Sequence, residues 1–223
     1  MSHSHFRTRR WVAAALLASA ALSSQANLLT NGSFEMGTFT GPVNGDQSLP
    51  VGSTSMTGWT VTIDSISWLN GSAFGLAPSD GSMYLDLTDF NDVGPSGGVT
   101  QTINTVIGNG YLLTYMLGTT NLYTSENAML ATAGATSATC SNPAAPTTNA
   151  DWYQCSMAFT ATSTTTAISL SGTGLQNFQY LGLDNVSVDL VSTAAVPEPA
   201  SLALVALALV GACASTTRAR RRS

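Results

Sequence analysis

The side chains between Asn27 and Ala195 that are charged at neutral pH are all carboxylates. This segment contains no lysine, arginine or histidine. Its chemistry is therefore limited to carboxylates, hydroxyl groups and cation binding through oxygen ligands. The acids are Glu35, Asp46, Asp64, Asp80, Asp86, Asp89, Asp92, Glu126, Asp151, Asp184 and Asp189.

The missing residue types argue against whole classes of function. Without Lys or Arg the segment cannot neutralise phosphates, so we expect no nucleic-acid binding. Without His it has no Ser-His-Asp nucleophile and no typical zinc site. A buried carboxylate also lacks a side-chain cation to pair with. It must be protonated, bonded to N–H or O–H donors, or bound to a metal ion such as Ca²⁺.

Asp184 is the acid whose position in a predicted strand is the most informative. It precedes Val186 and Val188, and in a strand it shares their parity. If these valines face the core, Asp184 points inward and has no basic partner. Two interpretations stay open: a structural calcium ion compensates the charge, or the carboxylate caps backbone amides near the start of the strand.

Four further acids lie close together in the chain: Asp80, Asp86, Asp89 and Asp92. Their spacing does not fit an EF-hand, which requires a Glu at the twelfth position. They are candidates for a second calcium site, or they are solvated residues of turns and loops. Glycosidase chemistry would need two carboxylates roughly 5–10 Å apart across a cleft. Nothing in the sequence marks such a pair, so we expect no enzyme activity.

Sugar binding would use aromatic ring faces and neutral polar groups. Trp68, Tyr84 and Tyr123 are our candidates, because each lies beside polar residues or alternates away from leucines. Packing of these rings in the core or on the surface is the competing interpretation. Trp59 and Trp152 are predicted to be core residues instead.

The elements that position these residues are predicted to be strands. Gly, Ser, Thr, Asn and β-branched residues dominate, and short alternating runs lie between turn signals. Evenly spaced strands of this kind are typical of an antiparallel sandwich. The expected strands are Gly58–Ile63, Ser82–Leu87, Val99–Val106, Tyr111–Gly118, Ala128–Thr132, Ser156–Thr162, Thr164–Ser171 and Leu183–Val191.

Cys140 and Cys155 are predicted to form a disulfide, because an exported domain meets an oxidising compartment. The competing interpretation is two free thiols. Export itself is predicted by residues 1–26, which read as a signal peptide. Three arginines precede an apolar run, Trp11 to Leu22, that is too short to span a membrane, and small residues then stand at the cleavage positions before Asn27.

The C-terminal end has three parts. Pro197, Glu198 and Pro199 precede an uncharged segment at 201–217, and an arginine cluster follows at 218–223. Arginines on the cytoplasmic side agree with the positive-inside rule and leave the β domain outside. This arrangement resembles the PEP-CTERM sorting signal, which implies recognition and processing by an exosortase-type enzyme. A plain C-terminal anchor after a Pro-rich linker is the competing interpretation.

Between the two ends, several motifs occur in an order that resembles the DUF642 and choice-of-anchor C group. They are the segments 27–35, 58–59, 79–87, 99–103, 110–115, 152–153, 159–160 and 180–188. The resemblance implies a galactose-binding-like jelly-roll β-sandwich. It also implies a structural calcium ion near the closing strand, which nominates Glu35 of the opening Asn-Gly-Ser-Phe-Glu motif beside Asp184.

We therefore expect a signal peptide at 1–26, an all-β jelly-roll domain at 27–192 and a linker at 193–200 with the Pro-Glu-Pro motif. A transmembrane sorting helix at 201–217 and a basic cytoplasmic tail at 218–223 follow. The protein is expected in the inner membrane before processing, and then at the cell surface or outside. Non-catalytic polysaccharide binding is the expected function. A matrix component without a defined ligand and a carboxylate-dependent glycosidase are the alternatives.

Overall fold

The computed structural model describes residues 27–89, 94–120, 124–125, 128–142, 151–174 and 179–193. Two antiparallel sheets build this part of the chain, and it contains no α-helix; its one helical turn is the 3-10 turn η1 (Ala73–Gly75). None of the described ranges holds a helix that is long and apolar enough to cross a membrane. The predicted signal peptide, Pro-Glu-Pro motif and C-terminal apolar segment lie outside these ranges.

The larger sheet has six strands, which range from four to eleven residues in length. β13 (Gly182–Ser192) lies between β4 (Met83–Asp86) and β6 (Gly110–Thr119), so the end of the domain pairs with its middle. In sheet order the strands are β1 (Asp46–Leu49), β3 (Ile66–Asn70), β4 (Met83–Asp86), β13 (Gly182–Ser192), β6 (Gly110–Thr119) and β10 (Asp151–Thr160).

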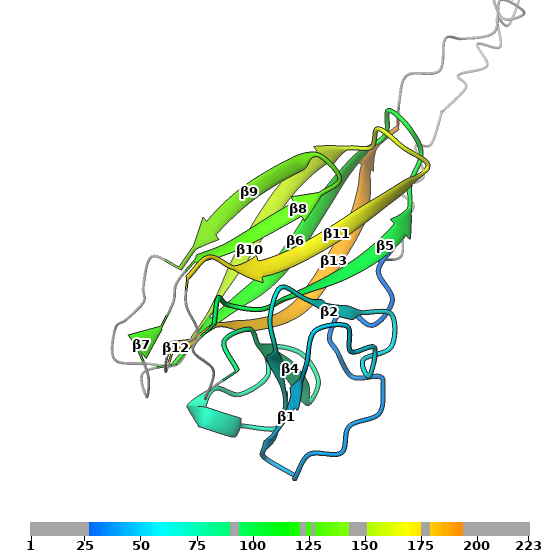
Figure 1. Cartoon of the computed structure of the whole chain (residues 1–223). Coiled ribbons are helices and arrows are strands. Elements are labelled where there is room, and N and C mark those ends of the chain that lie inside the picture. The colour runs from blue at the N-terminus through cyan, green and yellow to red at the C-terminus, as the bar shows by residue number, and fades with distance from the viewer. Residues whose placement is uncertain are drawn as a thin grey trace, which may run out of the picture.

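The second sheet has five strands and packs against the first (Figure 1). In sheet order they are β2 (Thr60–Thr62), β5 (Gly98–Asn104), β11 (Thr165–Gly172), β8 (Ala128–Ala133) and β9 (Thr136–Ser141). A short parallel pair, β7 (Thr124–Ser125) and β12 (Gln179–Tyr180), lies beside the two sheets.

Alternating side chains of both sheets form the main core. In β6, Leu113, Tyr115 and Leu117 are buried while the residues between them are half-buried. Ile168 and Leu170 of β11 face them from the other sheet and are fully buried. Successive side chains of a strand point to opposite faces of the sheet, so a strand that alternates apolar and polar residues places all its apolar side chains in this interior. Each fully buried aliphatic side chain contributes about 1.5–3 kcal/mol.

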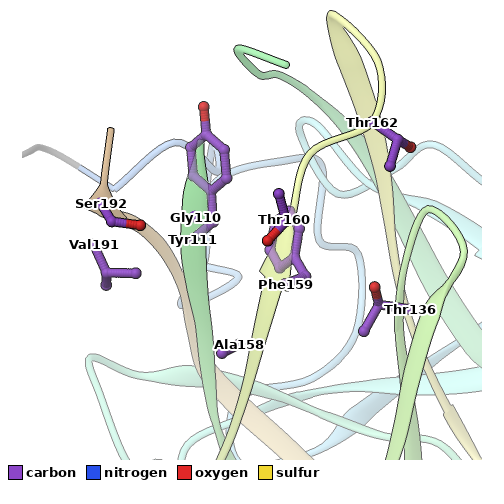
Figure 2. Close-up of a pocket in the computed structure, with 9 residues that line it drawn as sticks. All are labelled: Gly110, Tyr111, Thr136, Ala158, Phe159, Thr160, Thr162, Val191 and Ser192. Atoms are coloured by element: carbon purple, nitrogen blue, oxygen red, sulfur yellow. The ribbon is translucent and has the colours of Figure 1, made fainter. Parts of the chain in front are cut away.

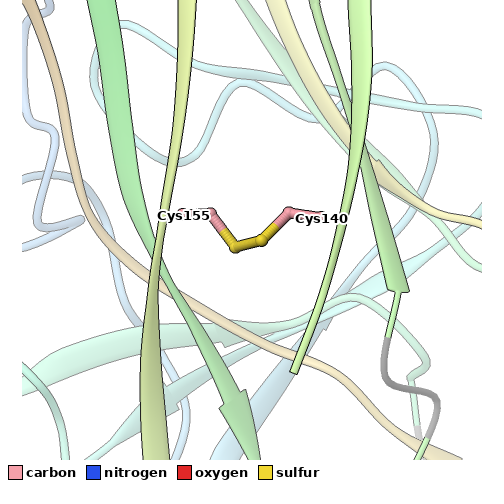
Figure 3. The surroundings of a disulfide bond; sticks show 2 residues. All are labelled: Cys140 and Cys155. Carbon is pink, nitrogen blue, oxygen red and sulfur yellow. A yellow bond between two sulfur atoms is a disulfide. The ribbon is translucent and has the colours of Figure 1, made fainter. Parts of the chain in front are cut away.

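A disulfide closes one side of the sandwich. Cys140 of β9 and Cys155 of β10 are bonded, with their Cα atoms 6.1 Å apart. β9 and β10 are edge strands of different sheets, so the bond ties the two layers together (Figure 3). The predicted disulfide is therefore present, and a loop of this length corresponds to about 3 kcal/mol of stabilisation.

A second, smaller core covers part of the outer face of the six-stranded sheet. It consists of Leu69, Ala73, Leu76, Tyr84 and Tyr180, with Trp152 and Phe74 packed against it. Glycines in β6 and β13 make room for it, because a Cβ atom at Gly118 would lie 2.7 Å from Leu76 Cδ2. The segment after β3 therefore lies down on the sheet instead of extending into solvent.

Candidate functional site

Asp184 is fully buried and holds the turn that precedes β4. Its Oδ2 accepts hydrogen bonds from the backbone N–H groups of Ser79, at 2.7 Å, and Asp80, at 2.8 Å. Its Oδ1 accepts one from the N–H of Asn185 at 2.6 Å. Three amides thus compensate a carboxylate that has no cationic side chain to pair with.

Asp184 is buried on the opposite side of the sheet from the one that strand parity predicted. Leu183 pairs with Leu117 and faces the main core, so Asp184, which pairs with Met116, points to the outer face. A β-bulge between Asp184 and Ser187 then inserts one residue. Because of that extra residue, Val186 returns to the core even though it shares the parity of Asp184. The prediction of burial was correct, and its stated direction was wrong.

Glu35 holds the other end of the same turn. Its Oε1 accepts hydrogen bonds from the N–H groups of Ser82, at 2.7 Å, and Met83, at 2.6 Å. Its Oε2 accepts one from the Ser82 hydroxyl at 2.8 Å. Gly81 at the apex of the turn has φ +64°, and a Cβ atom there would lie 2.4 Å from Glu35 Oε1. The predicted pair therefore does meet a common segment, with one carboxylate at each end of it.

The donors around these two carboxylates do not fit a calcium site. Calcium takes six to eight oxygen ligands, whereas the oxygens of Glu35 and Asp184 accept hydrogen bonds from N–H and O–H groups. The described part of the chain also contains no group of three or more Asp, Glu, His or Cys side chains that could hold a metal ion. The hydrogen bonds supply the compensation for which the ion was predicted, and calcium binding stays a prediction to be tested.

Asp86 is a second buried carboxylate on the outer face. Only 2% of it is exposed, and its Oδ1 accepts hydrogen bonds from the N–H and hydroxyl of Thr88 and from the N–H of Leu181. Burial raises the pKa of Asp86 to about 6, against the opposing effect of these hydrogen bonds. Burial likewise raises the pKa of Asp184 to about 7. Removing a carboxylate from water disfavours its charged form.

These raised pKa values do not make the two acids a catalytic pair. A general acid must reach the substrate atom that it protonates. Asp184 is fully buried and Asp86 nearly so, and their oxygens are occupied by the protein's own donors. Asp184 holds the turn that precedes β4, and Asp86 holds Thr88 and the N–H of Leu181 just before β13.

The local acidic cluster does not form a single site. Asp89 accepts hydrogen bonds from the hydroxyls of Ser48 and Ser67, whereas Asp86 is buried. Asp80 reaches Asp184 through its backbone N–H, and Asp92 lies outside the described residues. The interpretation of these acids as solvated loop residues is therefore wrong for Asp86.

Two of the three aromatic candidates are core residues. Trp68 is 1% exposed and donates from Nε1 to the Phe34 carbonyl at 3.1 Å. Tyr84 is fully buried, and its hydroxyl donates to the carbonyls of Ala73 and Leu76. Neither ring presents a face to solvent, which corrects the prediction that they stack on sugars. The third candidate, Tyr123, lies outside the described residues.

The two tryptophans predicted to be core residues differ from each other. Trp59 is buried in the main core and donates to the Asn31 carbonyl at 2.9 Å, as predicted. Trp152 is half-buried in the second core, where its ring meets the Tyr84 ring edge-on with centroids 5.8 Å apart. Its Nε1 donates to the Ala77 carbonyl, so Trp152 fixes the segment that covers the sheet.

A pocket of about 550 Å³ lies at the end of the sandwich where β6 begins and β13 ends (Figure 2). It is lined by uncharged residues: Gly110, Tyr111, Thr136, Ala158, Phe159, Thr160, Thr162, Val191 and Ser192. The rings of Tyr111 and Phe159 stack on each other with centroids 5.3 Å apart. The Tyr111 hydroxyl accepts a hydrogen bond from the N–H of Val106, and the lining also includes three threonines and a serine.

Sequence reasoning did not find this pocket. Its lining comes from the ends of β6, β9, β10 and β13, which are far apart in the chain, and no local motif joins them. The nearest available signal is the frequency of Thr and Ser beside predicted strand ends, which does not distinguish a pocket from ordinary turns.

The family assignment rests on a match that covers most of the chain. The model of DUF642, a protein family of unknown function, matches residues 27–189. The chain belongs to the DUF642 family. A second match, to the PEP-CTERM protein-sorting motif, covers residues 195–222. That motif indicates an exosortase-sorted protein that is exported and anchored in a membrane before processing. The resemblances seen in the sequence to DUF642 and to the PEP-CTERM motif are therefore confirmed.

The DUF642 domain is similar to several solved structures. A TmCBM61 carbohydrate-binding module in complex with β-1,4-galactotriose has a TM-score of 0.47 and 14% identity, over 74% of this chain and 99% of that one. A family 35 module from Clostridium thermocellum has 0.39 and 14%, over 64% and 97%. The enzymatically active domain of bacteriophage CBA120 tailspike protein 4 has 0.47 and 16%, over 74% of this chain but only 21% of that one. No curated protein matches the chain.

Proposed function

We propose that this protein is exported, sorted through its PEP-CTERM tail, and binds a neutral polysaccharide without catalysis. The observation that carries the proposal is the pocket at the end of the sandwich, whose lining is uncharged and combines hydroxyl groups with apolar surface. Sugars present the same combination of hydroxyls and C–H groups. Each threonine or serine hydroxyl can both donate to and accept from a sugar hydroxyl.

The charge of the domain restricts the class of polysaccharide. Between Asn27 and Ala195 the chain carries carboxylates and no basic side chain. A polymer of uronic acids would find no Arg or Lys at the uncharged pocket to bind its carboxylates. We therefore propose a neutral glycan as the ligand, and we interpret the sandwich as a jelly roll of the galactose-binding type.

The proposed route begins with the signal peptide at 1–26 and anchoring through the segment at 201–217. An exosortase-type enzyme then acts at the tail that contains Pro197, Glu198 and Pro199. The mature domain would reach the cell surface or the extracellular matrix. The alternative, a matrix component without a ligand, shares this route and differs only in what the pocket binds.

The test compares Thr160→Val with Thr102→Val on an array of neutral and acidic glycans. Valine keeps the shape of threonine and removes the hydroxyl; Thr160 lines the pocket, whereas Thr102 is exposed on β5 outside it. Losing one hydrogen bond to the ligand costs about 1 kcal/mol, so Thr160→Val should weaken binding roughly five-fold to ten-fold. Thr102→Val should bind like the unaltered protein.

Three results would contradict the proposal. Retention on acidic glycans alone would refute the neutral ligand class. Absence of binding to every polysaccharide would leave the matrix component without a ligand as the better explanation. Release of reducing sugar would instead support the glycosidase alternative.

A further inference from the structure

The end of the sandwich from which the C-terminal tail leaves carries exposed aliphatic side chains. Val106 and Ile107 form the turn before β6, and each is 59% exposed. Val191 stands next to the last residue of β13 and is 56% exposed. Pairing of Ser192 with Gly110 brings the end of β13 to the start of β6, and the Tyr111 hydroxyl ties the Val106 amide to it. We call these three residues the apolar tip.

The carboxylates of the described residues lie mainly toward the opposite end. Asp151 pairs with Thr119, the last residue of β6, and Asp86 pairs with Gly182, the first residue of β13. β1 and β4, which carry or adjoin most other acids, also lie at the end away from the tail (Figure 1). The nearest acid to the tip is Asp189, opposite Leu112, and its carboxylate accepts the Ser187 hydroxyl. Exposed aliphatic side chains also occur at the opposite end, where Val51 is 57% exposed, so the two ends differ in charge: the apolar tip is the end without carboxylates beside its exposed aliphatic side chains.

We propose that the apolar tip lies against the lipid–water interface of the membrane while the C-terminal segment still anchors the protein. This inference rests on the proposed anchoring. Only residues 193–200 separate the sandwich from the apolar segment at 201–217. At about 3.3–3.6 Å per residue, these eight residues span at most roughly 29 Å even when fully extended. The end that carries Val106, Ile107 and Val191 therefore cannot move far from the bilayer.

Charge and tethering both favour this orientation. Anionic headgroups repel carboxylates, so the end without them is the one that approaches the surface at the lowest cost. A single weak apolar contact would not hold a free protein on a membrane, but a tether makes the contact intramolecular and raises its effective concentration. The partner is therefore the membrane that holds the tail.

The pocket shares this end, because Val191 belongs both to the apolar tip and to the pocket lining. A polysaccharide and a lipid surface cannot occupy it together. Glycan binding would accordingly belong to the processed form, after the tail has been cut and the tip has left the membrane.

The test uses the full chain inserted in vesicles of phosphatidylethanolamine and phosphatidylglycerol. Cys213→Ser removes the thiol of the tail, and Ile107→Cys receives an environment-sensitive fluorophore. The matched control is Val51→Cys, because Val51 is 57% exposed and follows β1 at the other end. Vesicles with brominated acyl chains then report contact with lipid.

The label at residue 107 should lose about half of its fluorescence or more, because interfacial groups are buried roughly 5–10 Å deep at the headgroup boundary. The label at residue 51 should not change. A second measurement places the label at Val191→Cys. Adding Val106→Ser and Ile107→Ser to this variant should reduce the quenching of the label at residue 191.

The outcomes separate this inference from the proposal on which it rests. If the protein does not float with the vesicles, membrane anchoring itself fails, and the apolar tip loses its basis. If the protein floats with the vesicles but the labels at residues 107 and 51 are quenched equally or not at all, anchoring stands and the contact of the tip with lipid is refuted.

Discussion

The two buried carboxylates predict that the domain is more stable in mild acid than at slightly alkaline pH. Burial raises the pKa of Asp184 from 3.8 to about 7 and that of Asp86 from 3.8 to about 6. In the unfolded chain both acids release their protons at lower pH than they do in the fold. Between the ordinary pKa of 3.8 and the raised pKa of each acid, the folded state binds more protons than the unfolded chain. The free energy of unfolding therefore falls as pH rises through this range.

The size of the effect follows from the two pKa values. Each tenfold change in proton affinity corresponds to about 1.4 kcal/mol. From about pH 5 to pH 8, Asp184 should lose about 3 kcal/mol of its contribution and Asp86 about 1–2 kcal/mol, so the domain loses about 4 kcal/mol. Both side chains are at least 98% buried, so solvent screening reduces these figures little.

The assay is urea unfolding across this pH range with Asp184→Asn and Asp151→Asn. Asparagine cannot ionise, so Asp184→Asn should retain only the part of the slope that comes from Asp86. In acid, Asp184→Asn should be less stable than the unaltered domain, because its amide group cannot accept all the hydrogen bonds that both oxygens of Asp184 accept. This difference in the free energy of unfolding should become smaller toward pH 8. The exposed Asp151 serves as the control, and its substitution should keep the full slope.

A free energy of unfolding that is flat or rises between about pH 5 and pH 8 would refute this reasoning. It would mean that the three amides around Asp184 and the donors around Asp86 outweigh desolvation, so that both acids are ionised in the fold.

Three further predictions test the packing and the charge compensation. Replacing Cys140 and Cys155 by serine should lower the free energy of unfolding by about 3 kcal/mol in denaturant titrations; an unchanged midpoint would mean that other contacts hold the two sheets. Gly118→Ala should cost about 1–3 kcal/mol and quench or shift Trp152 fluorescence, because its Cβ would lie 2.7 Å from the Trp152 ring. Calcium should leave the melting temperature equal to that of an EDTA control; a rise of several degrees that Asp184→Ala abolishes would establish the metal site instead.

Most of the strands that sequence reasoning predicted have one buried face; β4 is an exception, because all four of its residues are buried and it was nevertheless predicted, at 82–87. β6 alternates regularly between buried and half-buried positions, and its prediction as 111–118 differs by one residue at each end from the structure. β3 was missed because four of its five residues are buried, which removes the alternation. β9 was missed for the opposite reason, since Thr136–Ser141 has small side chains and no buried position. A periodicity argument cannot identify either kind of strand.

The candidate site was predicted in its residues and not in its geometry. That Asp184 must be compensated followed from the absence of basic side chains. The β-bulge after it, with Asn185 at φ 48°, could not be foreseen, because nothing local shows that the residue is unpaired. A one-residue shift reverses the face of every following side chain, so the bulge moved the carboxylate from the main core to the outer face.

The absence of basic side chains connects these features. A domain that buries acids without lysine or arginine must use its own N–H groups, and here the turn at 79–83 supplies them to Asp184 at one end and Glu35 at the other. That turn leads into β4. The segment before it carries Leu76, which packs with Tyr84 in the second core, and Ala77, whose carbonyl accepts the hydrogen bond from Trp152 Nε1. Charge compensation therefore fixes the second core on the sheet, and the protonation state of Asp184 affects how firmly that segment is held. The pH slope and the Gly118→Ala variant consequently probe one structural unit from two sides. Their effects should not add, because Gly118 lies against Leu76 and Asp184 holds the amides of Ser79 and Asp80 in the same segment.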